Sequence, residues 1–139
     1  MLFRSQSTPA TTVIGLPAAT VRLTLGASHG CARLSDRSGW CWGANAYGQL
    51  GDGMTGNRDQ PVELPISDLA QIAPGGYSTG AGVGAQTCVL RTDRTVWCWG
   101  SNDFGQLGNG TVSAPIRTPA QVPGLVDIDE LVKIGRAHV

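Results

Sequence analysis

The stretch GWCWGANAYGQLGDG, residues 39–53, returns further along the chain as VWCWGSNDFGQLGNG, residues 96–110. From the first tryptophan to the last glycine, ten of fourteen positions are identical, at an offset of 57 residues (97 − 40). The same offset carries Cys31 onto Cys88. A constant internal period is the sequence signature of a repeat architecture, so the chain is built from copies of one structural unit.

Each unit reads as a set of short strands. Alternating apolar and polar residues, the period of a strand, are found in VRLTLG (21–26). A β-hairpin with an Asp in its turn is predicted by GCARL and WCWG in the first unit, and by TCVL and VWCWG in the second. The residue after each Asp is Arg37 or Arg94 where glycine would be easier, which leaves the turn type open. With a further strand near PVEL or PAQV, each unit has about four strands, as a propeller blade does.

The two copies resemble the repeat of the regulator of chromosome condensation family, which is shared with β-lactamase inhibitor protein II. The resemblance is carried by residues 31–53 and 88–110, and with flanking segments it extends from residue 7 to about 132. It implies an all-β fold, a fragment of a β-propeller with four-stranded antiparallel blades. The paired cysteines indicate the bacterial, secreted type of such repeats. The glycine-rich stretch YSTGAGVGA (77–85) departs from the spacing of the family.

The repeat pattern predicts where the units begin and end. Residues 1–17 are the expected tail of a preceding repeat, 18–65 the first repeat, and 66–125 the second repeat with its inserted loop. Residues 126–133 are the expected start of a further repeat, so two nearly complete blades carry partial units on both sides. Residues 134–139, IGRAHV, break the pattern and resemble translated sequencing-adapter read-through, so they are left out of the fold prediction.

The repeated motif is expected to maintain the scaffold. The glycines of GQLG suit a connection too tight for side chains, where a positive φ costs glycine little. Asn45 and Gln49 are expected to hydrogen-bond backbone groups that the turn leaves unpaired, with binding of a polar ligand as the alternative. Their repeats are given the same role. The motif comprises Trp42, Gly43, Asn45, Gly48, Gln49, Leu50, Gly51, Trp99, Gly100, Asn102, Gly105, Gln106, Leu107 and Gly108.

The paired tryptophans have a structural interpretation. Trp40 and Trp42 share one face of their strand while Cys41 lies on the other, because side chains alternate along a strand. A blade is packed between neighbours on both faces, so both faces can be apolar. Packing in the core is therefore favoured over a carbohydrate-binding platform.

The four cysteines fall into two pairs. Cys31 and Cys41 lie at equal distances from the centre of their hairpin turn, as do Cys88 and Cys98. Such residues face each other across antiparallel strands, within disulfide reach, so one disulfide per blade is the hypothesis. Reduced, buried cysteines are the alternative. Disulfides would indicate an extracellular, periplasmic or cell-surface protein, although the first residues show no signal peptide.

Several functions are not favoured. Lys plus Arg equals Asp plus Glu at ten each, which gives no electrostatic case for nucleic acid or an anionic membrane, and no apolar run is long enough to span a bilayer. No cofactor and no metal site are expected, because the cysteines lack Cys-x-x-Cys spacing and histidine partners. GASHG (26–30) fits G-x-S-x-G but precedes a strand, and the second unit has Ala85 and Gln86 there, so no catalytic residue is expected.

The resulting hypothesis is a non-enzymatic interaction module of a secreted or surface protein. Its partners would be an unidentified protein and further blades of the same full-length chain. Binding is expected in the segments that differ between units, namely 54–59, 77–85 and 111–117. The alternatives are a regulator of another enzyme, similar to a guanine-nucleotide exchange factor or an enzyme inhibitor, and a repeat domain appended to an enzyme.

Overall fold

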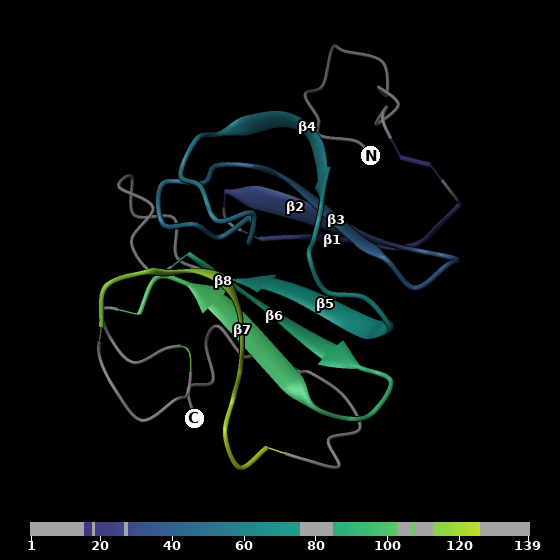
Figure 1. The fold of residues 1–139 in the computed structure, drawn as a ribbon. Helices are drawn as coiled ribbons and strands as arrows, with labels where there is room; N and C mark the ends of the chain where they lie inside the picture. Colours follow the sequence, from purple (N-terminus) through teal and green to yellow (C-terminus); the bar gives the residue numbers. More distant parts are fainter. Residues whose placement is uncertain are drawn as a thin grey trace.

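The structure, a computed structural model, describes residues 16–17, 19–26, 28–75, 85–102, 107 and 113–125. These residues form eight β-strands and no helix. The strands are β1 (Thr20–Leu25), β2 (His29–Leu34), β3 (Gly39–Gly43), β4 (Arg58–Glu63), β5 (Leu69–Gly75), β6 (Gln86–Arg91), β7 (Val96–Gly100) and β8 (Ile116–Gln121). They make two four-stranded antiparallel sheets in the orders β1-β2-β3-β4 and β5-β6-β7-β8. Figure 1 shows the sheets as two layers.

Matching turns join β2 to β3 and β6 to β7. The amide of Arg37 donates to the carbonyl oxygen of Leu34 at 2.9 Å, and Arg37 itself has a φ of 69°. Arg94 repeats this conformation with a φ of 71°. Asp36 Oδ1 accepts hydrogen bonds from the hydroxyl of Ser38 at 2.6 Å and from its amide at 3.0 Å, and these bonds lower the pKa of Asp36. Each turn is thus a three-residue hairpin loop with a left-handed arginine, supported by the aspartate in place of glycine.

The main core lies between the two sheets. Its buried side chains are Cys31, Cys41, Leu50, Leu64, Leu69, Ile72, Val89 and Trp99. A second cluster consists of Cys88, Leu90, Val96, Cys98, Leu107 and Val122. The division follows from alternation along a strand, because Trp99 points to one face of β7 while Val96 and Cys98 point to the other. The second sheet is therefore apolar on both faces.

The predicted all-β class and the four-stranded antiparallel sheets are confirmed. One strand, β5, was not located in advance, because its sequence LAQIAPG carries a proline and a glycine that weaken the strand signal. It lies at a sheet edge and pairs with β6 alone, a place that tolerates Pro74.

Candidate functional site

Both predicted cysteine pairs are joined in the structure. Cys31 bonds to Cys41 and Cys88 bonds to Cys98, with 4.1 Å between the Cα atoms of each pair. The partners lie directly opposite each other in the registers of β2 with β3 and of β6 with β7. All four are almost completely buried. Each disulfide therefore clips one hairpin inside its own sheet and does not connect the two sheets.

The first GQLG loop is organised by two amide side chains. Asn45 Oδ1 accepts the amide proton of Leu50 at 2.9 Å, and its Nδ2 donates to the carbonyl oxygen of Met54 at 3.1 Å. Gln49 Oε1 accepts the amide proton of Tyr47 at 2.8 Å. Asn45 is fully buried and Gln49 is 1% exposed. These two side chains hold the backbone of the loop, which is a scaffold role.

The second copy of the motif is described only in part. Asn102 Oδ1 accepts the amide proton of Leu107 at 3.2 Å, matching the contact in the first copy. Gly105, Gln106 and Gly108 lie outside the described residues. Their assignment to the scaffold remains a prediction.

The first GQLG loop also joins the two sheets. The carbonyl oxygen of Gln49 accepts hydrogen bonds from Trp99 Nε1 at 2.9 Å and from the hydroxyl of Thr87 at 2.6 Å. His29 Nε2 lies 2.8 Å from the same hydroxyl oxygen. A Cβ on Gly51 would lie 2.7 Å from Trp99 Nε1, so only glycine lets the loop approach the indole this closely. We call this set of contacts the blade junction.

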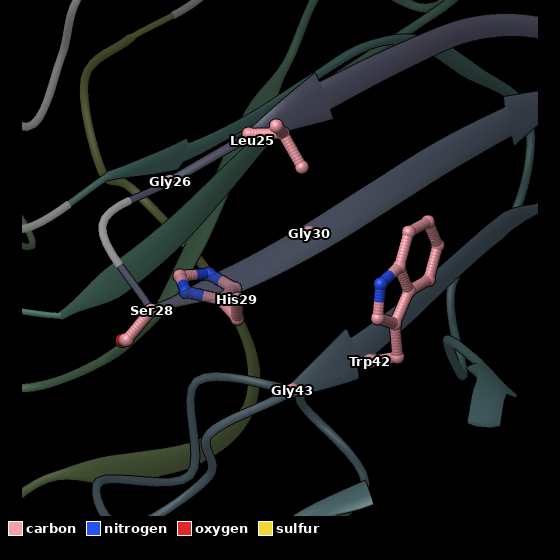
Figure 2. Close-up of a pocket in the computed structure, with 7 residues that line it drawn as sticks. All are labelled: Leu25, Gly26, Ser28, His29, Gly30, Trp42 and Gly43. Carbon is pink, nitrogen blue, oxygen red and sulfur yellow. The ribbon is translucent and has the colours of Figure 1, made fainter. Parts of the chain in front are cut away.

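The hydrogen bonds of the junction determine the state of His29. Because Thr87 gives its proton to Gln49, His29 Nε2 must carry the hydrogen that is donated to the hydroxyl. Nδ1 is then an acceptor, and it is buried without a partner. Burial lowers the pKa of His29 to about 4, which keeps the ring neutral at neutral pH. The Ser28 side chain points away from this ring (Figure 2), so the GASHG segment does not bring a base to its serine.

Sequence reasoning assigned Gln49, Gly51 and Trp99 to the scaffold but missed the part that His29 and Thr87 play in the junction. The second copy has Gln86 where the first has His29, and the first copy has Gly30 where the second has Thr87. Because the two copies agree elsewhere, such differences can be seen in the sequence. That signal marked a place where the two copies have different surroundings. It could not indicate that the two residues meet across the sheets.

Two of the three segments predicted to bind a partner lie side by side. The amide of Gly53 donates to the carbonyl oxygen of Arg117 at 3.0 Å, which joins the loop before β4 to the start of β8. Met54 is 58% exposed, and Arg58 forms an ion pair with Asp52 at 3.1 Å. We call residues 53–58 with 113–117 the two-loop surface; residues 111 and 112 lie outside the described part.

The carboxylate of Asp52 lies next to the two-loop surface and pairs with Arg58. Burial would raise the pKa of Asp52, but hydrogen bonds from the amide of Met54 and from the side chains of Asn45 and Arg58, with the charge of Arg58, hold this pKa below its usual value. The carboxylate therefore stays ionised and fixes the base of the loop. Of the third predicted segment, residues 77–85, only Ala85 is described, and it is buried.

A hollow of about 320 Å³ opens on the first sheet. Figure 2 shows its lining, with the Trp42 ring standing beside β2 and the His29 ring nearer the other end. The lining residues are Leu25, Gly26, Ser28, His29, Gly30, Trp42 and Gly43. It is mostly apolar. Within the described ranges, no three His, Cys, Asp or Glu side chains lie together so as to hold a metal ion. The part of the chain that the structure covers also has no helix long and apolar enough to cross a bilayer.

Comparison with known proteins gives consistent matches. The family model described as "Regulator of chromosome condensation (RCC1) repeat" matches residues 40–81 and 93–139, and a second model of the same description matches 77–106. The human E3 ubiquitin-protein ligase HERC2 is 30% identical over 114 residues, covering 82% of this chain and 2% of that protein. The ultraviolet-B receptor UVR8 of Arabidopsis thaliana is 33% identical over 109 residues, covering 78% of this chain and 24% of the receptor. The chain thus spans a small part of these relatives.

Solved structures share the fold. Human WBSCR16 superposes with a TM-score of 0.66 at 16% identity, covering 86% of this chain and 31% of that one. Prp20p from Saccharomyces cerevisiae, studied for its binding to Gsp1p and histones, superposes with a TM-score of 0.63 at 18% identity, covering 76% of this chain and 27% of that one. The two sheets are accordingly blades of a β-propeller. With the family model matching more than half of its residues, the chain belongs to the regulator of chromosome condensation (RCC1) repeat family.

Proposed function

We propose that the chain is a non-enzymatic protein-interaction module that contacts a protein partner through its two-loop surface. The observation that carries this proposal is the hydrogen bond from Gly53 to Arg117, because it places the segment that begins at Met54 beside the segment that ends at Arg117, and both segments differ between the two repeats. Residues that the repeats share maintain the scaffold. Differences are free to serve recognition, and loops on a rigid support are where binding residues concentrate.

The composition of this surface suits a protein partner. Met54 offers an exposed, adaptable apolar side chain, and Arg117 lies exposed beside the loop. Methionine and arginine are both enriched in protein–protein interfaces. The ion pair between Asp52 and Arg58 restrains the loop that carries Met54. Less conformational entropy is therefore lost when a partner binds.

The disulfides support an oxidising location for this module. Two fully buried bridges in a chain of this size are typical of proteins outside the cytosol. We therefore place the interaction in the extracellular space, the periplasm or at the cell surface, with further blades of the same protein as neighbours.

The test uses photo-cross-linking residues introduced at Met54 and Arg117, with Arg22 on β1 as the exposed control position. Partners captured from the source organism's secreted fraction at both loop positions and not at position 22 are then purified. We expect Met54→Ala combined with Arg117→Glu to weaken binding at least about tenfold, the effect of losing ~1.4 kcal/mol. Arg22→Glu should change the dissociation constant less than about twofold. Equal affinities for all variants would show that the contacts lie elsewhere.

A repeat domain appended to an enzyme is the second candidate. The match to HERC2 favours it, since that relative is named as a ubiquitin ligase and the matched region is only 2% of its length. The full reading frame decides this: an enzymatic domain in the same frame supports the appended arrangement. Regulation of another enzyme is tested by adding the chain to a nucleotide-exchange assay on a small GTPase.

A further inference from the structure

Met54 is an exposed residue of the two-loop surface whose backbone is fixed by two hydrogen bonds. Its amide donates to Asp52 Oδ1 at 3.0 Å, and its carbonyl oxygen accepts a hydrogen bond from Asn45 Nδ2 at 3.1 Å. The residue is 58% exposed. The side chain therefore extends into solvent from a restrained base, and a change in its chemistry does not disturb the buried part of the loop.

The sulfur of Met54 has a cationic neighbour. Arg58 Nη2 donates a hydrogen bond to Met54 Sδ at 3.6 Å. The same guanidinium is held by Asp52, whose Oδ2 lies 3.2 Å from Nε and 3.1 Å from Nη2. A thioether sulfur is only a weak hydrogen-bond acceptor. A strong donor, already fixed in place by a carboxylate, is thus directed at an atom that makes little use of it.

The second repeat indicates that the scaffold does not require a methionine at this position. GDGM at 51–54 is matched by GNGT at 108–111, so Thr111 stands where the first repeat has Met54. A polar residue is thus compatible with the repeat at this point. The chain has only two methionines, and the other is Met1. Met54 is therefore a feature of the first repeat alone, where it lies beside Arg58.

We propose that Met54 is a site of reversible oxidation, and that its sulfoxide switches off partner binding by the two-loop surface. The oxidant is a peroxide: the sulfur lone pair takes one oxygen atom from hydrogen peroxide, the O–O bond breaks, and water is released. A dithiol reverses the step and returns the thioether, with formation of one disulfide and one water. The oxidation itself depends only on the contacts of Met54, whereas its effect on binding rests on the proposed function.

The contacts of Met54 determine what each oxidation state presents to a partner. In the reduced state, the side chain is apolar and adaptable. In the oxidised state, the new oxygen is a strong acceptor beside Arg58 Nη2, and a hydrogen bond from a charged donor is stronger than one between neutral groups. The sulfoxide is polar and is held against the loop, so the surface loses its apolar contact. All four cysteines are already in disulfides, which leaves methionine as the sulfur that a peroxide oxidises first.

The first test is treatment of the full 139-residue chain with hydrogen peroxide, followed by peptide mass mapping that separates Met54 from Met1. We expect Met54 to be oxidised at a rate within about threefold of that of N-acetylmethionine amide in the same solution, because susceptibility follows exposure. A rate more than about tenfold slower would overturn the proposal. So would an oxidised chain whose original mass a methionine sulfoxide reductase with a dithiol does not restore.

The second test measures whether Arg58 holds the sulfoxide. Urea titrations give the folding equilibrium constants of the oxidised and reduced forms, whose ratio is compared between the unmodified chain and Arg58→Gln. We expect oxidation to favour the folded state at least about threefold more in the unmodified chain, as for one added hydrogen bond from a charged donor. The matched control is Arg117→Gln, which removes the other arginine of the same surface and should leave this ratio unchanged. Near-ultraviolet circular dichroism verifies that each variant is folded, and equal ratios in all three proteins would overturn the role of Arg58.

The third test uses the partner captured by the cross-linking experiment. Peroxide treatment of the unmodified chain should weaken binding at least about tenfold, and Met54→Gln, which copies the polar, unbranched sulfoxide, should do the same without peroxide. Met54→Leu has no sulfur at this position, so peroxide should not change its affinity. If Met54→Ala with Arg117→Glu weakens binding and oxidation does not, the switch is wrong and the proposed function stands. If neither change weakens binding, both proposals are wrong.

Discussion

Trp42 and Trp99 occupy equivalent positions in two nearly identical segments, yet one is partly open and the other fully buried. The difference does not come from their own sheets, since each is the fourth residue of a five-residue strand and directly follows a disulfide-bonded cysteine. It comes from the loop of the neighbouring blade that lies on Trp99. In such repeats, the folding stability is the sum of contributions within each unit and contributions from the interfaces between units. Trp99, the largest fully buried side chain among the described residues, contributes to the interface.

The largest expected difference between Trp42 and Trp99 is in how much folding stability is lost when the indole side chain is removed. Trp99→Ala leaves a cavity in the core and removes one of the two hydrogen bonds to the carbonyl oxygen of Gln49, and should lower the free energy of unfolding by about 3–5 kcal/mol. Trp42→Ala, at a partly exposed site, should cost about 1 kcal/mol. Urea titrations of dilute protein measure both values. Equal losses of stability would mean that the two indoles are equally covered in solution.

Acid should act on the junction through His29. Its pKa in the folded chain is about 4, below the ordinary value of 6.5, so the unfolded chain takes up a proton first as the pH falls. Stability is therefore unchanged above pH 6.5 and is lost between 6.5 and about 4, by about 3 kcal/mol in total. Urea midpoints across this range measure the loss. His29→Gln, which copies the residue of the second blade, should abolish the dependence; a slope that survives it would assign the titration to another group.

Two glycines of the first loop, Gly51 and Gly53, allow the effect of a side-chain contact to be separated from the effect of backbone conformation. Gly51 and Gly53 both have positive φ, 74° and 81°, but an added Cβ would meet Trp99 at 2.7 Å only in the first case. Both alanine variants bear the strain of a left-handed backbone, and Gly51→Ala also overpacks the junction, so it should be less stable by about 2 kcal/mol more. Thermal and urea unfolding of the pair tests this. The reverse order would argue against close packing of the loop on the indole.

The smallest expected effect belongs to the hydroxyl that links the two sheets. Thr87→Val keeps the side-chain shape but leaves the His29 N–H without an acceptor, and should cost about 1–2 kcal/mol. Thr87→Ser keeps the hydroxyl and should recover most of this loss. If serine proves no better than valine, the hydrogen bonds contribute little and packing accounts for the junction.

Local features were predictable because short-range chemistry decides them. The spacing of Cys31 and Cys41 about a turn predicts their bond, since residues equidistant from a hairpin turn must face each other. The repeat of WCWG and GQLG predicts the four-stranded unit. In the turn itself, Asp36 accepts the hydrogen bonds that let Arg37 adopt a positive φ. The arginine therefore did not prevent prediction of the hairpin and left only the turn type undecided.

Long-range features were not predictable in the same way. Nothing in the letters around Trp42 and Trp99 tells which indole is covered, because burial depends on a loop about fifty residues away in the chain. The meeting of Gly53 with Arg117 likewise depends on how the two sheets stack. Such contacts depend on how the units are placed relative to one another, and the sequence that the repeats share does not specify this placement.

The placement of the disulfides also has a consequence for synthesis. Each bridge joins cysteines ten residues apart, inside a single repeat. When such a chain emerges into an oxidising compartment, the second cysteine of a pair follows the first almost at once, so oxidation of one blade can finish before the cysteines of the next blade emerge. A gene segment that encodes one repeat carries its covalent link complete. Duplication of that segment therefore adds a blade without creating an odd cysteine, and the number of blades can change over evolutionary time while the redox chemistry of every blade stays the same.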